Sequence, residues 1–159
     1  MNAPANVVNI VIAGLGGQGV LKASDIVADA VFRMGFDVKK AEVHGMSQRG
    51  GSVASDVRYG VKVFSPMVPP GEADYLVVLA PDQIAPNLPQ LRPGGTVIDP
   101  SMIPAGTLRN QRTLNVALLG VLSRLLALPE SVWVDAIRDN LPDKLHEMNL
   151  EAFQKGRTL

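Results

Sequence analysis

The sequence predicts an α/β fold: a three-layer, Rossmann-like domain with a mixed, mostly parallel sheet. Residues 7–35 combine an apolar strand, a glycine-rich turn and an amphipathic helix. Short apolar runs within 73–81 and 93–100 are typical of further buried strands, and helical patterns separate or follow them. The 159 residues contain no internal repeat or linker. We therefore expect a single domain over residues 1–159.

The first helix is predicted over residues 20–34, because its apolar and charged side chains separate onto two faces. Gly35 supplies the stop signal. The apolar face comprises Val20, Ala23, Val27, Ala30 and Met34, and the polar face comprises Lys22, Asp25, Asp29 and Arg33.

The turn before this helix has the spacing G-x-G-x-x-G in GLGGQG, residues 14–19. In such a turn Gly14 permits a tight bend, Gly16 lets the backbone approach an anion, and Gly19 allows close helix packing. The helix start offers free N–H groups to a phosphate. The same spacing also occurs in structural strand-to-helix turns, so both interpretations stay open.

The middle of the chain is rich in strand and turn signals. Residues 36–43 are predicted to form a second strand, and HGMSQRGG, residues 44–51, a glycine-bounded loop. Residues 52–58 alternate in polarity, and Tyr59-Gly60 is expected to turn into VKVFS, giving an antiparallel hairpin. Residues 65–72 hold three prolines and a glycine and are expected to be a loop.

The second half is predicted to be mostly helical. PDQIAPNLPQL, residues 81–91, is a short, proline-interrupted helix, and 93–100 a turn followed by a buried strand. Residues 115–128 are apolar almost all round, which predicts a helix facing a partner as well as the sheet. Pro129 is expected to open another helix that Pro142 interrupts. Residues 144–159 are expected to be helical and then frayed.

Composition excludes several functions. Fifteen basic and fifteen acidic residues give zero net charge, without the basic run of a nucleic-acid binder. The chain contains no cysteine, which rules out disulfides and thiolate ligands for iron–sulfur clusters. The N-terminal residues lack a signal-peptide pattern, and VVNIVIAGLGG is too short to span a membrane, so a cytoplasmic location is expected.

A few side chains are candidates for chemistry. His44 and His146 are the only histidines and have no ligand partners at metal-binding spacing, so no metal site is expected. His44 could act as a hydrogen-bond donor or acid, or be structural, whereas His146 is expected to be solvated. Arg49 suits a phosphate or carboxylate, or an ion pair. Glu42 could bind a ribose or pair with Arg49.

Three motifs together resemble a known family: GLGGQGV at 14–20, AEVHGMSQRGGSV at 41–53 and NLEAFQKG at 149–156. They are similar to the gamma-type domain of 2-oxoacid:acceptor (pyruvate/ketoisovalerate) oxidoreductases. Within that family they most resemble the small (beta) subunits of indolepyruvate ferredoxin oxidoreductases. The HGMSQRGG loop followed by a strand is the specific part, and the resemblance spans nearly the whole chain.

The resemblance implies an enzyme subunit that is inactive alone. Its partner would be a large (alpha) subunit that carries thiamine diphosphate and iron–sulfur clusters. Such a complex oxidatively decarboxylates a 2-oxoacid to an acyl-CoA and passes electrons to ferredoxin or another acceptor. Coenzyme A would lie at the interface between the subunits. The absence of cysteine agrees with this division, and the substrate could be indolepyruvate or a related aryl 2-oxoacid.

The resemblance also implies which residues form the site. The expected cofactor-binding residues are Gly14, Gly16, Gly17, Gln18, Gly19, Ser47, Gly50 and Gly51, and the expected catalytic residues are His44, Gln48 and Arg49. One departure from the family lies between Pro100 and Asn115, where this chain has a short connection in place of a longer segment with another strand. We therefore expect an altered sheet edge there.

Two rival hypotheses remain. The first is a free-standing protein that binds NAD or FAD through GLGGQG, with Glu42 on the ribose. The second is a non-catalytic interaction or scaffold module, in which replacing Arg49 would leave the activity of an assembled complex unchanged.

Overall fold

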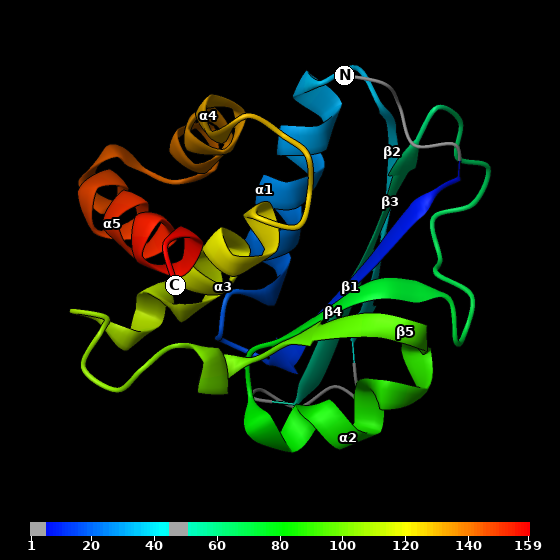
Figure 1. Ribbon diagram of the computed structural model, residues 1–159, viewed down its shortest axis with the longest axis horizontal. Coiled ribbons are helices and arrows are strands. Elements are labelled where there is room, and N and C mark those ends of the chain that lie inside the picture. Colours follow the sequence, from blue (N-terminus) through cyan, green and yellow to red (C-terminus); the bar gives the residue numbers. More distant parts are fainter. Residues whose placement is uncertain (1–5, 45–50) are drawn as a thin grey trace.

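The first strand, β1 (Val8–Leu15), lies at the centre of a five-stranded sheet in a computed structural model that describes residues 6–44 and 51–159 (Figure 1). The strand order is β2-β3-β1-β4-β5. The other strands are β2 (Asp37–His44), β3 (Ser52–Gly60), β4 (Ala73–Val78) and β5 (Leu91–Ile98). β3 pairs antiparallel with β1 and β2, and the other pairings are parallel. Four strands thus share one direction, confirming the predicted sheet.

Helices cover both faces of this sheet (Figure 1). Four of them lie on one face, where α5 packs on the outer side of α3: α1 (Val20–Arg33), α3 (Leu114–Ser123), α4 (Glu130–Asn140) and α5 (His146–Arg157). The short α2 (Ile84–Asn87) lies on the other face, between 3₁₀ turns at Pro81–Gln83 and Leu88–Gln90. The expected three-layer architecture and the proline-interrupted helix are confirmed. Among the described residues, no helix is both long and apolar enough to cross a membrane.

The two-faced pattern of residues 20–34 forms α1 as predicted. Val20, Ala23, Val27 and Ala30 are buried, while Asp29 and Arg33 form an ion pair at 2.9 Å on the outer side. Gly35 adopts a φ of 86° and its N–H donates to Phe32 O, which ends the helix.

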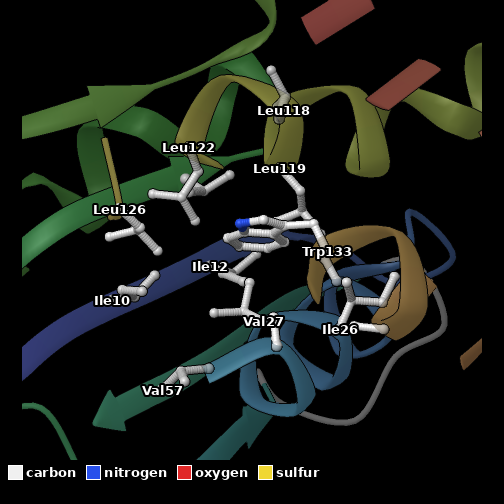
Figure 2. Close-up of a cluster of buried hydrophobic side chains, with 14 of the residues drawn as sticks. Ile10, Ile12, Ile26, Val27, Val57, Leu118, Leu119, Leu122, Leu126 and Trp133 are labelled. Carbon is white, nitrogen blue, oxygen red and sulfur yellow. The ribbon is translucent and has the colours of Figure 1, made fainter. Parts of the chain in front are cut away.

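The main core lies between the sheet and the larger helical layer. Trp133 of α4 is fully buried there, among Ile12 of β1, Val27 of α1 and Leu119 and Leu122 of α3 (Figure 2). Phe153 of α5 packs beside the Trp133 ring, with 5.9 Å between ring centroids. Residues from the second half of the chain therefore close the core that β1 and α1 begin.

The predicted hairpin between residues 52–58 and 61–65 is wrong. β3 does form, but both of its edges are already paired, one with β1 and the other with β2. Residues after Gly60 therefore find no free edge on β3. Instead, residues 61–72 form a connector without helix or strand that leads from β3 to β4. The expected loop at 65–72 is part of this connector.

Three further expectations needed correction. β5 is an edge strand whose only buried residue is Ile98, so it is not buried as predicted. The helix expected at 115–128 ends at Ser123 and is covered by α5 of this same chain. His146 is not simply solvated: its Nε2 lies 2.8 Å from Arg138 O and 2.7 Å from Leu141 O. It thereby bonds carbonyls at the end of α4, where backbone acceptors lack helical partners.

The contact between α3 and α5 depends on two glycines. A Cβ on Gly120 of α3 would overlap Phe153 O, and one on Gly156 of α5 would overlap Ala117 O. The backbones therefore touch at this crossing. Arg157 Nη1 also donates to Ser123 Oγ at 2.8 Å. Gly156 is the last residue of the NLEAFQKG motif. The close packing of α3 against α5 explains why this motif ends in glycine.

Gly156→Ala should lower the free energy of unfolding by at least about 2 kcal/mol, because the new methyl group meets a fixed carbonyl rather than a flexible side chain. Helix propensity alone would favour alanine by about 1 kcal/mol. Denaturant unfolding measures the difference. In Gly106→Ala, the control, the Cβ meets nothing within 4 Å and only the cost of a φ of 80° remains. Equal losses in the two variants would contradict the packing argument.

Asp56 of β3 is a buried carboxylate that accepts a hydrogen bond from Val68 N at 2.9 Å. Burial raises the pKa of Asp56, opposed by this hydrogen bond and by the charge of Arg58. A raised folded-state pKa means that the stabilising contribution is fully present below the unfolded pKa of about 3.9 and is lost as the pH rises through the folded value.

Asp56→Asn keeps an acceptor for Val68 N but cannot ionise. Its free energy of unfolding relative to wild type should therefore rise as the pH increases from acid to neutral, and chemical unfolding at a series of pH values measures this trend. Asp135→Asn, at an exposed position of α4, is the control. A difference for Asp56→Asn that is the same at every pH would contradict the role given to burial.

Candidate functional site

The GLGGQG turn lies at the carboxyl end of β1, next to the end of β4. Gly14 still belongs to β1 and is buried, whereas Gly16 and Gly17 are exposed. Gly17 and Gly19 adopt φ values of 87° and 81°, which side chains other than glycine rarely accept. The turn thus presents bare backbone at the start of α1, as the motif predicts.

Gln18 holds the turn together from inside. Its Oε1 accepts from Leu15 N at 2.7 Å, and its Nε2 donates to Leu79 O at 3.5 Å. The side chain therefore links the turn to the residue that follows β4. Gln18 was expected to bind a cofactor, and the observed bonds give it a structural role as well.

Asn115 of α3 fixes the other end of the turn. Its Nδ2 donates to Gly19 O at 3.1 Å, and its Oδ1 accepts from Val116 N at 2.9 Å. A Cβ on Gly19 would overlap the Asn115 amide. Gly19 is thus needed for close packing, as the motif predicts, and the contact is made by a helix distant in sequence.

Beside the turn lies an open hollow of about 430 Å³. Its lining residues come from the turn, from the end of β4 and from the segment before α3: Gly17, Gln18, Gly19, Leu79, Gln111, Arg112 and Leu114. Among the described residues of this lining, Arg112 is the one that carries a charge, and that charge is positive. Its backbone is fixed because Arg112 N donates to Asn110 Oδ1 at 2.9 Å.

The hollow occupies the position where α/β sheets commonly bind ligands. β1 continues through α1 to β2 on one side of the sheet, and β4 continues to β5 on the other. β1 and β4 are therefore neighbours whose connections lead in opposite directions, and ligands bind at the carboxyl ends of such strands. The volume also falls in the range of small-molecule sites.

The two ends of the predicted loop 44–51 lie at the same end of the sheet as the glycine turn, where β1 and β2 finish. His44, the last residue of β2, pairs with Val53, which in turn pairs with Gly14. Gly51 O accepts from Gly16 N at 2.9 Å, and Ser52 Oγ donates to Gln83 Oε1 at 2.9 Å. Ser47, Gln48, Arg49 and Gly50 lie outside the described residues, as does the His44 side chain.

The dinucleotide geometry expected for Glu42 is not present. β3 lies between β1 and β2, so Glu42 is two strand spacings from β1, about 9.5 Å. In a dinucleotide fold the ribose-binding carboxylate follows a strand adjacent to the glycine turn. Here Glu42 Oε1 lies 3.4 Å from Lys40 Nζ, which also pairs with Asp25 of α1.

Sequence reasoning missed Arg112 and Asn115. Asn115 carried a usable signal, because it is a polar residue at the start of an otherwise apolar helix. Arg112 carried none, since its place beside the turn depends on the folding of residues 99–113. That segment contains two 3₁₀ turns, Pro100–Met102 and Gln111–Thr113, and no strand, so β5 remains the sheet edge. Across the described ranges, no three His, Asp or Glu side chains gather as metal ligands.

These features define an α/β fold with an open candidate ligand site at the carboxyl ends of β1 and β4. Among the described residues, this site holds no complete catalytic set. The family model for pyruvate ferredoxin/flavodoxin oxidoreductase matches residues 9–159. The chain belongs to this family, which confirms the resemblance inferred from its three motifs.

Individual relatives agree with this assignment. Indolepyruvate oxidoreductase subunit IorB of Thermococcus kodakarensis is 34% identical, with 93% of each chain covered. The gamma subunit of a keto/oxoacid ferredoxin oxidoreductase from Geobacter sulfurreducens has a TM-score of 0.71 and 23% identity, over 94% of this chain and 95% of that one. These relatives are subunits of oxidoreductases.

The same fold also occurs inside a longer polypeptide. A 2-oxoglutarate:ferredoxin oxidoreductase from Magnetococcus marinus, solved with 2-oxoglutarate, coenzyme A and succinyl-CoA, gives a TM-score of 0.79 and 21% identity. The match covers 98% of this chain but about a third of that one, 31%. The alignment with the Thermococcus subunit spans 188 positions, more than the 159 residues here, so that relative carries residues that this chain lacks.

Gly19→Ala should destabilise the fold more than Gly17→Ala, and denaturant unfolding of both variants tests this. Each substitution forces alanine into a left-handed φ, at a cost of about 1–2 kcal/mol. Only at Gly19 does the methyl group also overlap Asn115, which adds about 1–3 kcal/mol. At Gly17 no atom of the described residues lies within 4 Å of the added Cβ. Equal losses would show that Asn115 does not hold the turn.

Proposed function

We propose that this chain is the small subunit of a thiamine-diphosphate-dependent 2-oxoacid:ferredoxin oxidoreductase. Its partner is the large subunit, and the reaction is the oxidative decarboxylation of indolepyruvate or a related aryl 2-oxoacid to an acyl-CoA. Family membership and the similarity to an indolepyruvate oxidoreductase subunit along nearly the whole chain support this proposal. We further propose that the hollow beside the glycine turn completes the active site of the large subunit.

The proposal that the hollow completes the active site rests on one observation, the presence of Arg112 in its lining. Its positive charge and bare backbone suit an anionic group, either the carboxylate of a 2-oxoacid or a phosphate of coenzyme A. A guanidinium can hold such a group with two parallel hydrogen bonds. The hollow is open to one side. In this proposal the large subunit covers that side and contacts the bound ligand.

The redox groups must be held by the partner. No iron–sulfur cluster can be ligated by cysteine thiolates from this chain, because the sequence has none. Thiamine diphosphate, when bound in the large subunit, supplies the chemistry that cleaves the bond to the carboxylate. The tasks proposed for this chain are to bind an anion through Arg112 and the turn, and to contribute His44, Gln48 and Arg49 from the loop that begins at the same sheet edge.

The alternative function is a free-standing protein that binds NAD or FAD through the glycine turn. The glycine spacing and the position of the hollow favour it, whereas the interposed β3 and the Lys40–Glu42 contact disfavour it. Calorimetry of the lone chain with NAD and FAD distinguishes the two. Micromolar binding would support the alternative and contradict our proposal that the chain is incomplete by itself.

The proposed function is tested by producing the chain with the thiamine-dependent large subunit from the same genome. The assay follows ferredoxin reduction with indolepyruvate or phenylglyoxylate and coenzyme A. Activity should require both chains, and the two substrates should be ranked by kcat/KM. Full activity of the large subunit alone, or of this chain alone, would contradict the proposal.

Arg112→Ala should raise the KM for the 2-oxoacid or for coenzyme A by about 10- to 100-fold, the usual range for a lost charged hydrogen bond. Folding of the chain should be unaffected, since the side chain is exposed. Arg124→Ala is the matched control, because Arg124 is also exposed and lies at the opposite end of α3, about 15 Å away. Unchanged kinetics for Arg112→Ala would favour a scaffold role for this side of the domain.

A further inference from the structure

The connector, residues 61–72, contains no helix or strand, but side-chain hydrogen bonds hold it against the sheet. Side chains from three strands bond to its backbone at four places along its length. These bonds are Val63 N to Asp37 Oδ2 at 2.8 Å, Arg58 Nη1 to Ser65 O at 2.7 Å, Val68 N to Asp56 Oδ2 at 2.9 Å, and Asn9 Nδ2 to Glu72 O at 3.0 Å.

Two further features fix the shape of the connector. Val63 and Val68 are buried, with 1% and 4% of their surface exposed. Prolines at positions 66, 69 and 70 restrict the backbone between and beyond them. The connector has therefore already lost the conformational freedom that a loop would otherwise lose on binding, and such preorganisation favours affinity.

This fixed segment presents large apolar side chains to the outside. Val61, Phe64 and Met67 are 71%, 86% and 56% exposed. They lie outside the core, although each is adjacent in the chain to one buried residue, Gly60, Val63 or Val68. Aromatic residues and methionine are enriched in the centres of protein interfaces, and aromatic side chains frequently dominate the binding energy.

A positive charge lies beside Phe64. Lys62 Nζ lies 5.9 Å from the centre of the Phe64 ring. Lys39 and Lys62 also act on Asp37: the hydrogen bond from Val63 N is the main cause of its lowered pKa, and the two lysine charges add to it. Lys39 lies two residues after Asp37 on β2, and Lys62 directly precedes Val63, so both lysines lie near the Val63–Asp37 hydrogen bond. A matching surface would have an apolar pocket bordered by carboxylates.

We propose that the connector forms a second contact with the large subunit, at the opposite ends of β1 and β4 from the hollow, with Phe64 in an apolar pocket and acidic side chains facing Lys62 and Lys39. This inference rests on the proposed function. The large subunit is the expected partner because the same fold forms about a third, 31%, of one longer oxidoreductase chain. Where the domain is a separate chain, it must meet the remaining polypeptide through its surface, and the connector is preorganised for that contact.

The test measures the dissociation constant between this chain and the large subunit by sedimentation or biolayer interferometry. Phe64→Asp should weaken binding by about thirtyfold, the effect of losing a central aromatic anchor. Lys62→Glu should weaken it at low salt, with a smaller effect at high salt. Phe32→Asp is the matched control, because Phe32 is 69% exposed and belongs to α1, outside the connector. Its affinity should match wild type.

Thermal unfolding first verifies that the variants are folded. Binding of Phe64→Asp within twofold of wild type would overturn the docking inference but leave the proposed function intact. Loss of self-association in Phe64→Asp with unchanged affinity for the large subunit would also overturn it, by assigning the surface to a second copy. Failure of the wild-type chain to bind the large subunit would contradict the proposed function as well.

Discussion

The fold and its candidate site both depend on close packing at the end of β1. A Cβ on Gly14 would come within about 3 Å of three groups, Gln18 Oε1, Leu79 Cβ and Val20 Cγ2. Strand, turn, first helix and the end of β4 therefore meet where no side chain fits. Because protein interiors are packed as densely as crystals, this close contact fixes the position of the turn relative to β4. It therefore also fixes the side of the hollow that the turn and the end of β4 form.

Glycine motifs in this chain consequently have different tasks. Gly14, Gly19 and Gly156 permit close contacts within the protein, as the overlaps at each Cβ position show. Gly16 and Gly17 are exposed and leave backbone accessible. Gly17 and Gly19 line the hollow where a ligand could lie, so Gly19 has both tasks. A family motif can thus combine residues that preserve the fold with residues that serve the site.

The sequence alone was sufficient for the α/β class, the α1 pattern and the family, because each follows from local periodicity or contiguous motifs. Strand pairing between segments distant in the sequence was harder to predict. Nothing local indicates that β3 pairs on both edges and leaves residues 61–65 outside the sheet. Asn115 and Arg112 reach the glycine turn only after α3 has packed, nearly a hundred residues further along the chain. Residues joined through tertiary packing were therefore the ones that pattern reasoning missed.

We propose that the glycine turn and the segment before α3 face the large subunit. Hydrogen–deuterium exchange of this chain, free and in the assembled complex, tests this arrangement. Amides of residues 16–19 and 111–114 should exchange more slowly in the complex, because the partner would exclude water from the hollow. Formation of a stable, active complex with exchange at these residues unchanged would contradict the claim.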